Sequence, residues 1–594
     1  MIKQYLVIWL FSMVVIHHTK CQKEGDTWMI GYTTQLSSAR FSVMHLEFAS
    51  GDLNLKLDYN EKSRFQETSS SISDSNAVPF LWTNGMQVRG KGNVDVLDTI
   101  AYEPGQYSYW KFWFSSVHDM PFGFPVETGA LIIPDVGNTH QSIIVYHIAG
   151  LSHEVGGWLI KGWLHAKVEH KPDDTFTTIY KDSLFSEKLE WFSYGLNAVR
   201  HANGRDWWLI TFEWESSKYF AYLLDSSGIH LDHEGDVGGI VKGGLGQTVI
   251  SPKGNFIGRT DTGPTAEGQS VTLFSFDRCV GEVRLLPTFH LGYESFKQGV
   301  AFSPSEQYFY VTALNRELWQ FDLWSEDIPS SQTLVGAYDG FVDPGPTGFG
   351  PMMQTPDGRL YVVAAAGSSE YLHVIDRPDL PAADCRFLQH HIDLTVSNAR
   401  SAPNIPNYRL GPLDGSPCDT LGLNNMATSR WRYEPNIEYR PLAVRFTDLS
   451  FYEPTAWHWD FGDGQTSEEI SPIHEYSEYG LYHVCQTVSN EYAQDSTCRW
   501  VEIMPYTSSD DPMGSTDLAL SPNPFTNQLR IESQSGIFRS AQVCLLDLQG
   551  QIVFSTGEIP VPVTIKVPDL LAGMYICRIQ EEDGEITSLK VVKQ

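Results

Sequence analysis

The sequence SPKG at residues 251–254 recurs as SPSE at 303–306 and as TPDG at 355–358, at a constant spacing of 52 residues. A β-rich segment follows each copy: NFIGRT, QYFYVTAL and RLYVVAAA. Proline sets φ for the second position of a turn, and glycine tolerates the positive φ that many turns require. Each copy is therefore expected to connect two antiparallel strands of one sheet.

The repeat extends beyond these turns. A second strand-like segment follows each first strand and ends in aspartate, at Asp277, Asp322 and Asp376. A sheet of about fifty residues cannot bury both of its faces alone, so it stacks on the next copy. Four-stranded sheets around a common axis meet this requirement, so residues 22–430 are predicted to form a β-propeller of about seven blades. A row of β-sandwiches is the alternative, although it would not normally repeat a turn at constant spacing.

The composition agrees with an all-β globular protein. Residues 25–422 show almost no amphipathic helical periodicity, and short apolar runs are broken by Gly, Pro, Asn and Asp. The chain has 594 residues, 42% hydrophobic and 19% charged, which excludes a mainly disordered or coiled-coil protein. Asp and Glu number 72 against 41 Lys and Arg, so the net charge is −31. Such a chain repels phosphate backbones, and no nucleic-acid partner is expected.

The first 21 residues have the pattern of an export signal. Lys3 precedes the run YLVIWLFSMVVI at residues 5–16, which is too short to span a bilayer but suits a signal peptide. Cleavage before Gln22 is expected. A lipoprotein signal would use Cys21, but Lys20 stands where that signal needs a small residue. No later apolar run is long enough for a transmembrane helix, so none is expected.

The eight cysteines agree with an oxidising compartment. Cys485 and Cys498 lie 13 residues apart in one short β-rich segment, and Cys385 and Cys418 bracket a loop rich in Pro, Gly and Asn. Both pairs are expected to form disulfides, although the sequence leaves the connectivity open. Metal binding is the alternative, but the chain contains no CxxC pair.

Residues 436–504 carry a short motif followed by strand-rich sequence. The motif is Trp459, Asp460, Phe461, Gly462, Asp463 and Gly464. With the later segment HEYSEYGLYHVCQTVSN, it resembles the PKD domain, which implies an immunoglobulin-like β-sandwich. The two aromatic residues alternate into the core and the Gly-Asp-Gly segment forms a hairpin turn. The two aspartates are expected to shape the turn, because the spaced oxygen ligands of a calcium loop are missing.

A polar linker at residues 505–517 leads to a last module at 518–594. Its motif residues are Pro522, Asn523, Pro524, Gly573, Tyr575, Lys590 and Lys593. In this order they resemble the type A sorting domain of the type IX secretion system. The resemblance implies handling by that secretion machinery, transport across an outer membrane and a cell-surface or extracellular location. Cys544 and Cys577 lie outside the pattern and are expected to pair or to remain buried thiols.

Parts of the predicted propeller resemble an uncharacterised propeller family of secreted Bacteroidetes proteins. The stretches are PFLWTNGMQV at 79–88, GALIIPD at 129–135 and ADCRFLQHHIDL at 383–394. This resemblance implies the fold and supports a Cys385–Cys418 pairing, but it implies no activity.

No catalytic or cofactor motif stands out. His153 and Glu154 begin an HExxH pattern that fails because Gly157 replaces the second His, and neither GxSxG nor a P-loop is present. The best metal candidate is the segment HLDHEGD at 230–236, for which a polar loop between blades is the preferred interpretation. His390 and His391 are expected to pack or to face solvent. We therefore expect no metal and no cofactor.

Exposed tryptophans would suit a sugar ligand, but those in blade strands are more often core residues. Trp207, Trp208, Trp110, Trp113 and Trp158 are the candidates. Without a catalytic constellation, we expect a surface or secreted binding protein for an extracellular glycan or protein. The alternatives are a polysaccharide- or peptide-degrading enzyme with its site in the propeller channel, and a structural adhesin.

Overall fold

A computed structural model gives the structure of the chain. Two compact units are present, residues 1–427 with 451–453, and residues 428–450 with 454–594. The described residues are 23–31, 41–61, 63–97, 128–138, 140–152, 157–184, 195–241, 246–261, 270–286, 289–291, 299–343, 345–365, 367–435, 440, 442–504, 518–521, 526–533, 539–546, 552–567, 570, 573–581 and 586–593. The expected signal peptide lies outside them.

The first unit is built from antiparallel sheets, most of them with four strands in sequence order. The strands are, sheet by sheet, β1 (Thr27–Gly31), β2 (Val43–Glu47) and β3 (Asn54–Asp58); β4 (Ser70–Ser73), β5 (Pro79–Thr83), β6 (Val88–Gly90) and β7 (Val94–Leu97); β8 (Ala130–Pro134), β9 (Gln141–Ser152), β10 (Gly157–His170) and β11 (Phe176–Leu184); β12 (Asn197–Arg200), β13 (Trp207–Phe212), β14 (Ser216–Asp225) and β15 (Gly228–Val241); β16 (Thr248–Ile250), β17 (Phe256–Asp261), β18 (Ser270–Asp277) and β19 (Glu282–Leu285), with β20 (Phe289–His290) beside β18; β21 (Val300–Phe302), β22 (Tyr308–Ala313), β23 (Glu317–Asp322) and β24 (Thr333–Ala337); β25 (Phe349–Gln354), β26 (Leu360–Ala364), β27 (Ser369–Ile375) and β28 (Phe387–Asn398). Two short 3-10 helices, Pro329–Ser331 and Ala382–Cys385, precede β24 and β28.

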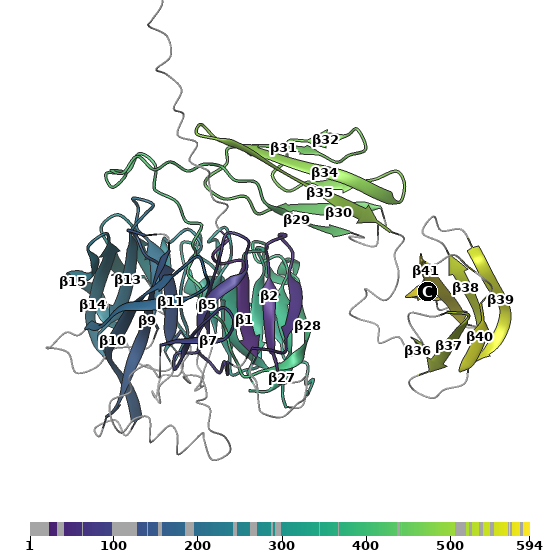
Figure 1. The fold of residues 1–594 in the computed structure, drawn as a ribbon, viewed down its shortest axis with the longest axis horizontal. Coiled ribbons are helices and arrows are strands. Elements are labelled where there is room, and N and C mark those ends of the chain that lie inside the picture. Colours follow the sequence, from purple (N-terminus) through teal and green to yellow (C-terminus); the bar gives the residue numbers. More distant parts are fainter. Residues whose placement is uncertain are drawn as a thin grey trace, which may run out of the picture. The chain divides into compact units, whose positions relative to one another are not determined.

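Consecutive sheets pack face to face, and the last sheet packs on the first. Trp28 and Met44 of the first sheet share an apolar core with Tyr361 and Val374 of the last. In Figure 1, β28 accordingly lies beside β1 and β2. The described residues of this unit thus form a propeller-like ring of seven sheets, and each buries apolar side chains against both neighbours.

The repeated turns connect the first and second strands of three successive sheets. Residues 251–254 join β16 to β17, 303–306 join β21 to β22, and 355–358 join β25 to β26. Gly254 has φ +80°, and its N–H donates to the Ser251 carbonyl. The Ser251 hydroxyl oxygen also accepts the N–H of Phe256, which begins the next strand. These hydrogen bonds explain why the repeat favours Ser or Thr at the first position and Gly at the fourth.

Two of the repeated aspartates have a matching role at the same end of the sheets, where they lie beside the repeated turns. Asp277 and Asp322 end the third strands β18 and β23. Each carboxylate accepts the backbone N–H of the residue two positions later, Cys279 or Trp324. Such Asx turns start the connection to the fourth strands β19 and β24, so the sequence repeat marks the turns at one end of these sheets.

Polar side chains fill the centre of the ring, where the first strands of the sheets lie closest together. The Gln247 side chain accepts the N–H groups of Val300 and Met352 and donates to the Met352 carbonyl. On the other side, the Asn404 amide donates to the carbonyls of Ala130 and Leu196. The centre is therefore occupied by buried amides that bridge neighbouring sheets.

Residues of the second unit form two β-sandwiches. In the first, one sheet has the order β29-β30-β33 and the other β32-β31-β34-β35. Their bounds are β29 (Trp431–Pro435), β30 (Ala443–Asp448), β31 (Ala456–Asp460), β32 (Thr466–Ser467), β33 (Ile473–Glu475), β34 (Gly480–Ser489) and β35 (Gln494–Ile503). Trp431, Phe446, Trp459 and Phe461 form its aromatic core between the sheets.

The last module is also a sandwich, with sheets β36-β37-β40 and β39-β38-β41-β42. The strands are β36 (Leu518–Ser521), β37 (Gln528–Ser533), β38 (Arg539–Leu546), β39 (Ile552–Val561), β40 (Val563–Lys566), β41 (Gly573–Glu581) and β42 (Ile586–Lys593). Gly573 pairs with Lys593 across β41 and β42, and Tyr575 is buried. Pro522, Asn523 and Pro524 lie outside the described residues.

The disulfides correct one expectation. Cys485 and Cys498 are bonded to each other across β34 and β35. Cys418, however, is bonded to Cys279, 139 residues earlier, and not to Cys385. The expected pairing is wrong because Cys385 lies in the core between the last two sheets, where it is fully buried as a free thiol. Sequence distance favoured Cys385, whereas folding brings the β18–β19 turn to Cys418.

Cys544 and Cys577 do not pair in the structure. They lie on neighbouring strands, but Cys577 pairs in register with Leu545, so the two thiols point to opposite faces. Burial raises the pKa of Cys577 to about 12. Cys577 is therefore a buried thiol, which is one of the two outcomes expected from the sequence.

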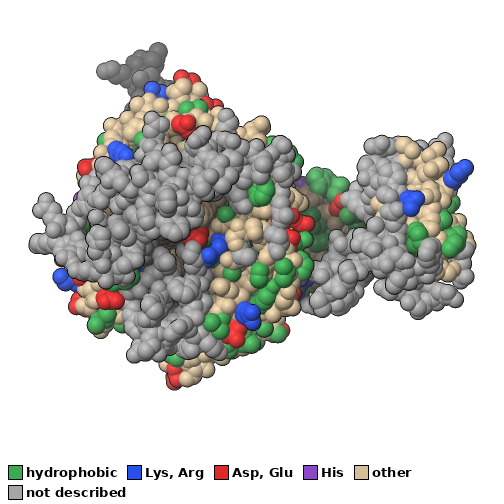
Figure 2. Space-filling model, turned by 90° about the horizontal axis from the view of Figure 1, so that it is seen from below, with side chains coloured by type: hydrophobic (Ala, Val, Ile, Leu, Met, Phe, Trp, Pro, Cys, Tyr) green, Lys and Arg blue, Asp and Glu red, His purple; other side chains and the backbone are tan. Residues whose placement is uncertain are grey.

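Charged side chains are scattered over the described part of the face shown in Figure 2. Acidic and basic residues lie next to each other in places, and no basic patch is seen there. None of the helices in the described ranges is long and apolar enough to cross a membrane.

Candidate binding cleft

The first sheet has one apolar face and one face that is polar apart from Met29 and Val43, which pack on Phe65 and Trp82. On the apolar side, Trp28, Ile30, Met44 and Leu46 pack toward the last sheet. On the other side, the alternate residues of β2 are Val43, His45 and Glu47, and those of β3 are Asn54, Lys56 and Asp58. A blade between two neighbours is expected to be apolar on both sides, so this polar face needs a separate explanation.

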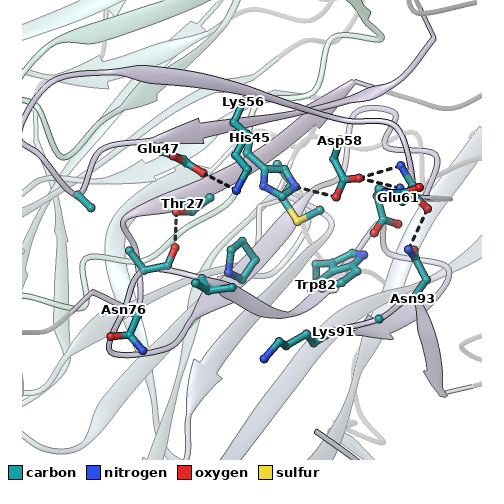
Figure 3. A pocket seen from close by; sticks show the side chains of 17 residues that line it. Thr27, His45, Glu47, Lys56, Asp58, Glu61, Asn76, Trp82, Lys91 and Asn93 are labelled. Carbon is teal, nitrogen blue, oxygen red and sulfur yellow. Dashed lines mark hydrogen bonds and ion pairs between the residues drawn. The ribbon is translucent and has the colours of Figure 1, made fainter.

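The polar face opens into a cleft between the first two sheets (Figure 3). Its volume is about 380 Å³, which is in the range of small-ligand sites. The first sheet and the loop after it contribute Thr27, Met29, His45, Glu47, Ala49, Lys56, Asp58, Asn60 and Glu61, and the second sheet contributes Asn76, Ala77, Val78, Pro79, Trp82, Lys91, Gly92 and Asn93. Sequence reasoning singled out none of these residues.

His45 and Asp58 form the centre of one wall. The His45 Nε2 lies 3.6 Å from the Asp58 Oδ2, and this nitrogen has no hydrogen-bond partner. Burial lowers the pKa of His45, although the carboxylate of Asp58 acts in the opposite direction. The imidazole is therefore neutral at pH 7.

Asp58 also organises the loop at the end of β3. Its Oδ1 accepts the N–H groups of Asn60, at 2.8 Å, and Glu61, at 3.2 Å. The Asn60 carbonyl accepts from the Asn93 side chain of the second sheet, at 2.9 Å. These contacts hold the two walls together at one end of the cleft and leave the Asp58 Oδ2 facing His45 (Figure 3).

Glu61 and Trp82 form a buried end of the cleft. The Glu61 Oε1 accepts the Ser63 N–H at 2.7 Å, and the Trp82 indole donates to the Ser63 hydroxyl at 3.0 Å. Burial raises the pKa of Glu61. This end therefore combines an aromatic ring with a carboxyl that is held by a neutral hydrogen-bond network.

Lysines stand at the mouth. Lys56 lies 3.6 Å from Glu47, and Lys91 makes an ion pair of 2.8 Å with Asp174. Both lysine side chains are largely exposed. Because each is already paired with a carboxylate, the cleft presents hydrogen-bonding groups of both kinds without a strong net charge.

The metal candidate from the sequence, HLDHEGD at 230–236, lies on a strand and not in a loop. Residues 230–236 lie on the outermost strand β15, and that loop interpretation is wrong. A register shift between Leu231 and His233 places His230 and His233 on one face of the strand and Glu234 and Asp236 on the other, so the ligands are divided. His233 contacts Asp232 at 2.8 Å and Tyr219 at 3.3 Å, whereas Asp236 accepts from Ser217.

Of the histidines at 390 and 391, the first has structural partners and the second lies on the surface. His390 lies 2.6 Å from Asp339 and packs on the ring of Phe341. His391 is exposed, and partial desolvation of its ring lowers its pKa. His153 and Glu154 lie outside the described residues.

The tryptophans suggested by the sequence as a sugar-binding surface form no exposed platform in the described part of the first unit. Trp207 and Trp208 are fully buried between sheets, in the core position expected for them. Trp110 and Trp113 lie outside the described residues, as does the side chain of Trp158.

The aspartates of the motif at 459–464 shape the turn between β31 and β32. Asp460 accepts the Gly462 N–H, and Asp463 accepts the Gln465 N–H, both at 3.0 Å. Asp463 also lies 2.8 Å from His474, whose ring stacks on Phe461. Gly462 has φ +78° and its Cα faces the backbone of His483, so a side chain at this position would clash.

Comparisons with known families identify the two C-terminal modules. Residues 437–503 match the PKD domain family, and residues 519–594 match the secretion system C-terminal sorting domain family. The sorting domain indicates export by the type IX secretion system to the cell surface or the extracellular space. No curated protein matches the chain.

Solved structures similar to parts of the chain include the PKD1 domain of Vibrio anguillarum Epp, with 26% identity over 14% of this chain and 95% of that domain, at a TM-score of 0.12. A protein from Lactobacillus plantarum is 12% identical over 63% of this chain and 99% of that one, at 0.35. The periplasmic gluconolactonase PpgL of Pseudomonas aeruginosa is 14% identical over 63% and 96%, at 0.31. At these TM-scores, none of the three says what this chain binds.

Proposed function

We propose that this exported protein binds a hydroxyl-rich extracellular glycan in the cleft between its first two sheets. The observation that carries the proposal is the set of polar side chains on one face of the first sheet, which line a cleft of about 380 Å³ beside the apolar contact of Met29 and Val43 with Trp82. A small, concave site suits one or two sugar rings better than a protein surface, which is typically flat and much larger.

The chemistry of the walls supports a sugar ligand. Sugar hydroxyls both donate and accept hydrogen bonds, so they suit walls that mix carboxylates, amides and a neutral imidazole. Asp58 and Glu47 supply acceptors, Asn76 supplies an amide, and Trp82 supplies an aromatic surface. The unpartnered His45 Nε2 beside Asp58 gives a bound hydroxyl a position at which it satisfies two groups.

A hydrolase or lyase in the central channel is the less favoured function. Gln247 and Asn404 fill the described centre of the ring with side chains that already hydrogen-bond to the backbone of neighbouring sheets. A ligand there would have to break these buried hydrogen bonds.

A glycan array probed with the full chain tests the proposal. The Asp58→Asn variant keeps an oxygen for the Asn60 and Glu61 N–H groups and replaces the charged acceptor beside His45 with an uncharged amide donor. Removing one charged acceptor is expected to weaken glycan binding at least about tenfold, equal to about 1.4 kcal/mol.

The matched control is Asp232→Asn, an exposed carboxylate on β15 of another sheet. This variant is expected to bind like the unchanged protein. Equal loss in both variants, or no glycan bound by the unchanged chain, would overturn the proposal. Product analysis on each bound glycan separates binding from degradation, because released oligosaccharides would favour the enzyme.

A further inference from the structure

Three potential metal ligands gather on the outer face of the PKD sandwich. His483 and Cys485 are two residues apart on β34 and therefore point to the same side of the sheet. Cys498 lies directly opposite Cys485 on β35, with a Cα–Cα distance of 4.0 Å. The His483 Nδ1 is 4.0 Å from the Cys485 Sγ, and the ligating atoms of all three residues lie within 4.8 Å of one another.

The close spacing of its ligating atoms sets this cluster apart from the rest of the described chain. Within the described ranges, it is the only group of three or more His, Cys, Asp or Glu residues with ligating atoms this close. The neighbouring strand β31 places Asp460 beside Cys485, and its exposed side chain belongs to the same face. The histidine ring is in contact with the exposed Trp500 at 4.9 Å between ring centres.

In the oxidised protein, the two sulfurs are joined in a disulfide and neither is a thiolate. Metal binding requires the thiolate form, so this state offers only one strong ligand, His483. Cys498 and His483 are exposed and Cys485 is half-buried, so small thiols can reach the bond.

We propose that reduction of this disulfide creates a site for a thiophilic divalent cation such as zinc. Two molecules of a low-molecular-weight thiol reduce the Cys485–Cys498 bond and leave as one disulfide, while the protein gains two thiols. The cation then binds both sulfurs with the loss of two protons, and the His483 Nδ1 becomes the third ligand. Asp460 or water completes the four-coordinate set that zinc prefers.

The rigid hairpin favours this assignment. β34 and β35 pair over ten residues, from Gly480–Ile503 to Ser489–Gln494, so the backbone holds the three ligands in register after the sulfur bond opens. Preformed ligand positions reduce the ordering that binding must impose. The site is independent of the glycan cleft, so failure of either proposal leaves the other standing.

A metal titration of the full chain tests this inference. The protein is reduced with a phosphine, freed of reductant without oxygen, and titrated with Zn²⁺ against a chromogenic chelator. We expect the reduced chain to bind one more equivalent than the Cys485→Ser/Cys498→Ser variant, which retains every other cysteine. Co²⁺ is expected to give thiolate-to-metal charge-transfer absorption that the double variant lacks.

The His483→Gln variant keeps both cysteines and separates a ligand role from a structural one. We expect it to bind Zn²⁺ at least tenfold more weakly while its oxidised form melts like the unchanged protein. The oxidised chain is expected to lack the extra equivalent. Equal stoichiometry in the reduced chain and in the double variant would overturn the site, and unchanged affinity in His483→Gln would remove His483 from it.

Discussion

His147 shows how burial determines the titration of a single side chain. It lies on β9 opposite Trp163, is nearly fully buried, and has no hydrogen-bond partner at either ring nitrogen. Burial lowers its pKa to about 3, from a usual value near 6.5. The folded protein therefore keeps this ring neutral under conditions in which the unfolded chain is protonated.

This difference predicts a loss of stability in acid. Below pH 6.5 the unfolded chain binds a proton that the folded chain does not, so stability is complete above pH 6.5 and falls as the pH decreases toward 3. Each pH unit in this window costs about 1.4 kcal/mol for one such group. Urea unfolding at pH 7, 6 and 5 measures the slope, and the His147→Leu variant is expected to have a smaller one.

Other groups contribute to the same pH range, so the comparison with His147→Leu is the decisive measurement. Burial also lowers the pKa of His373 to about 4, and it raises the pKa of Glu61, which acts in the opposite direction. An unchanged slope in His147→Leu would contradict the assignment of this acid sensitivity to His147.

The cysteine pairing gives a second prediction at the residue scale. Peptide mapping without reduction is expected to find Cys279 linked to Cys418 and Cys485 linked to Cys498. Cys385 is buried and burial raises its pKa to about 11, so it should react with alkylating reagents only after unfolding. A Cys385–Cys418 peptide would contradict the structure.

The elements are held together at the ring centre by side chains that bridge strands. Gln247 makes three hydrogen bonds to backbone groups of two other sheets. Its alanine variant leaves buried N–H groups of Val300 and Met352 without partners. We expect a loss of about 2–5 kcal/mol in the free energy of unfolding, measured by denaturant unfolding.

Gln389→Ala is the matched control for this element-scale prediction. Gln389 also bridges two strands through its amide, to Ala337 and Asp339, but these contacts are exposed. Water replaces them, so the cost is expected to stay below about 1 kcal/mol. A similar cost for both variants would show that burial at the ring centre is not the cause.

Export is a property of the whole molecule. The sorting domain at residues 519–594 indicates passage through the type IX secretion system. Deletion of this segment is expected to leave the protein in the periplasm, as measured by cell fractionation and surface labelling. Deletion of residues 437–503 removes the PKD domain and keeps the sorting domain, so this control should still be exported.

A surface location of the chain without residues 519–594 would contradict the prediction. If both truncated chains were missing from the cell surface, degradation would be the cause to examine. Immunoblotting of whole cells distinguishes degraded chains from chains retained in the periplasm.

The repeated turns were predictable because their signals are local. The Ser-Pro-x-Gly pattern depends on φ at two positions and on a hydroxyl that caps the next strand, and all of these lie within six residues. The core positions of Trp459 and Phe461 follow from strand alternation in the same way. The two C-terminal modules also carry their own sequence motifs.

The cleft could not be predicted in this way. The alternation of His45 and Glu47 with Met44 and Leu46 is present in the sequence, and it indicates one polar face. The same pattern describes any strand with one face in water. Only the packing of a second sheet on that side turns the polar face into the wall of a site.

By itself, the sequence determined the all-β architecture, the blade turns, the PKD and sorting modules and the route of export, because each depends on short segments. Tertiary structure alone decided that Cys418 bonds Cys279 across 139 residues and that amides fill the ring centre. These features depend on which distant surfaces meet, and that is determined by packing of the whole ring rather than by any local preference.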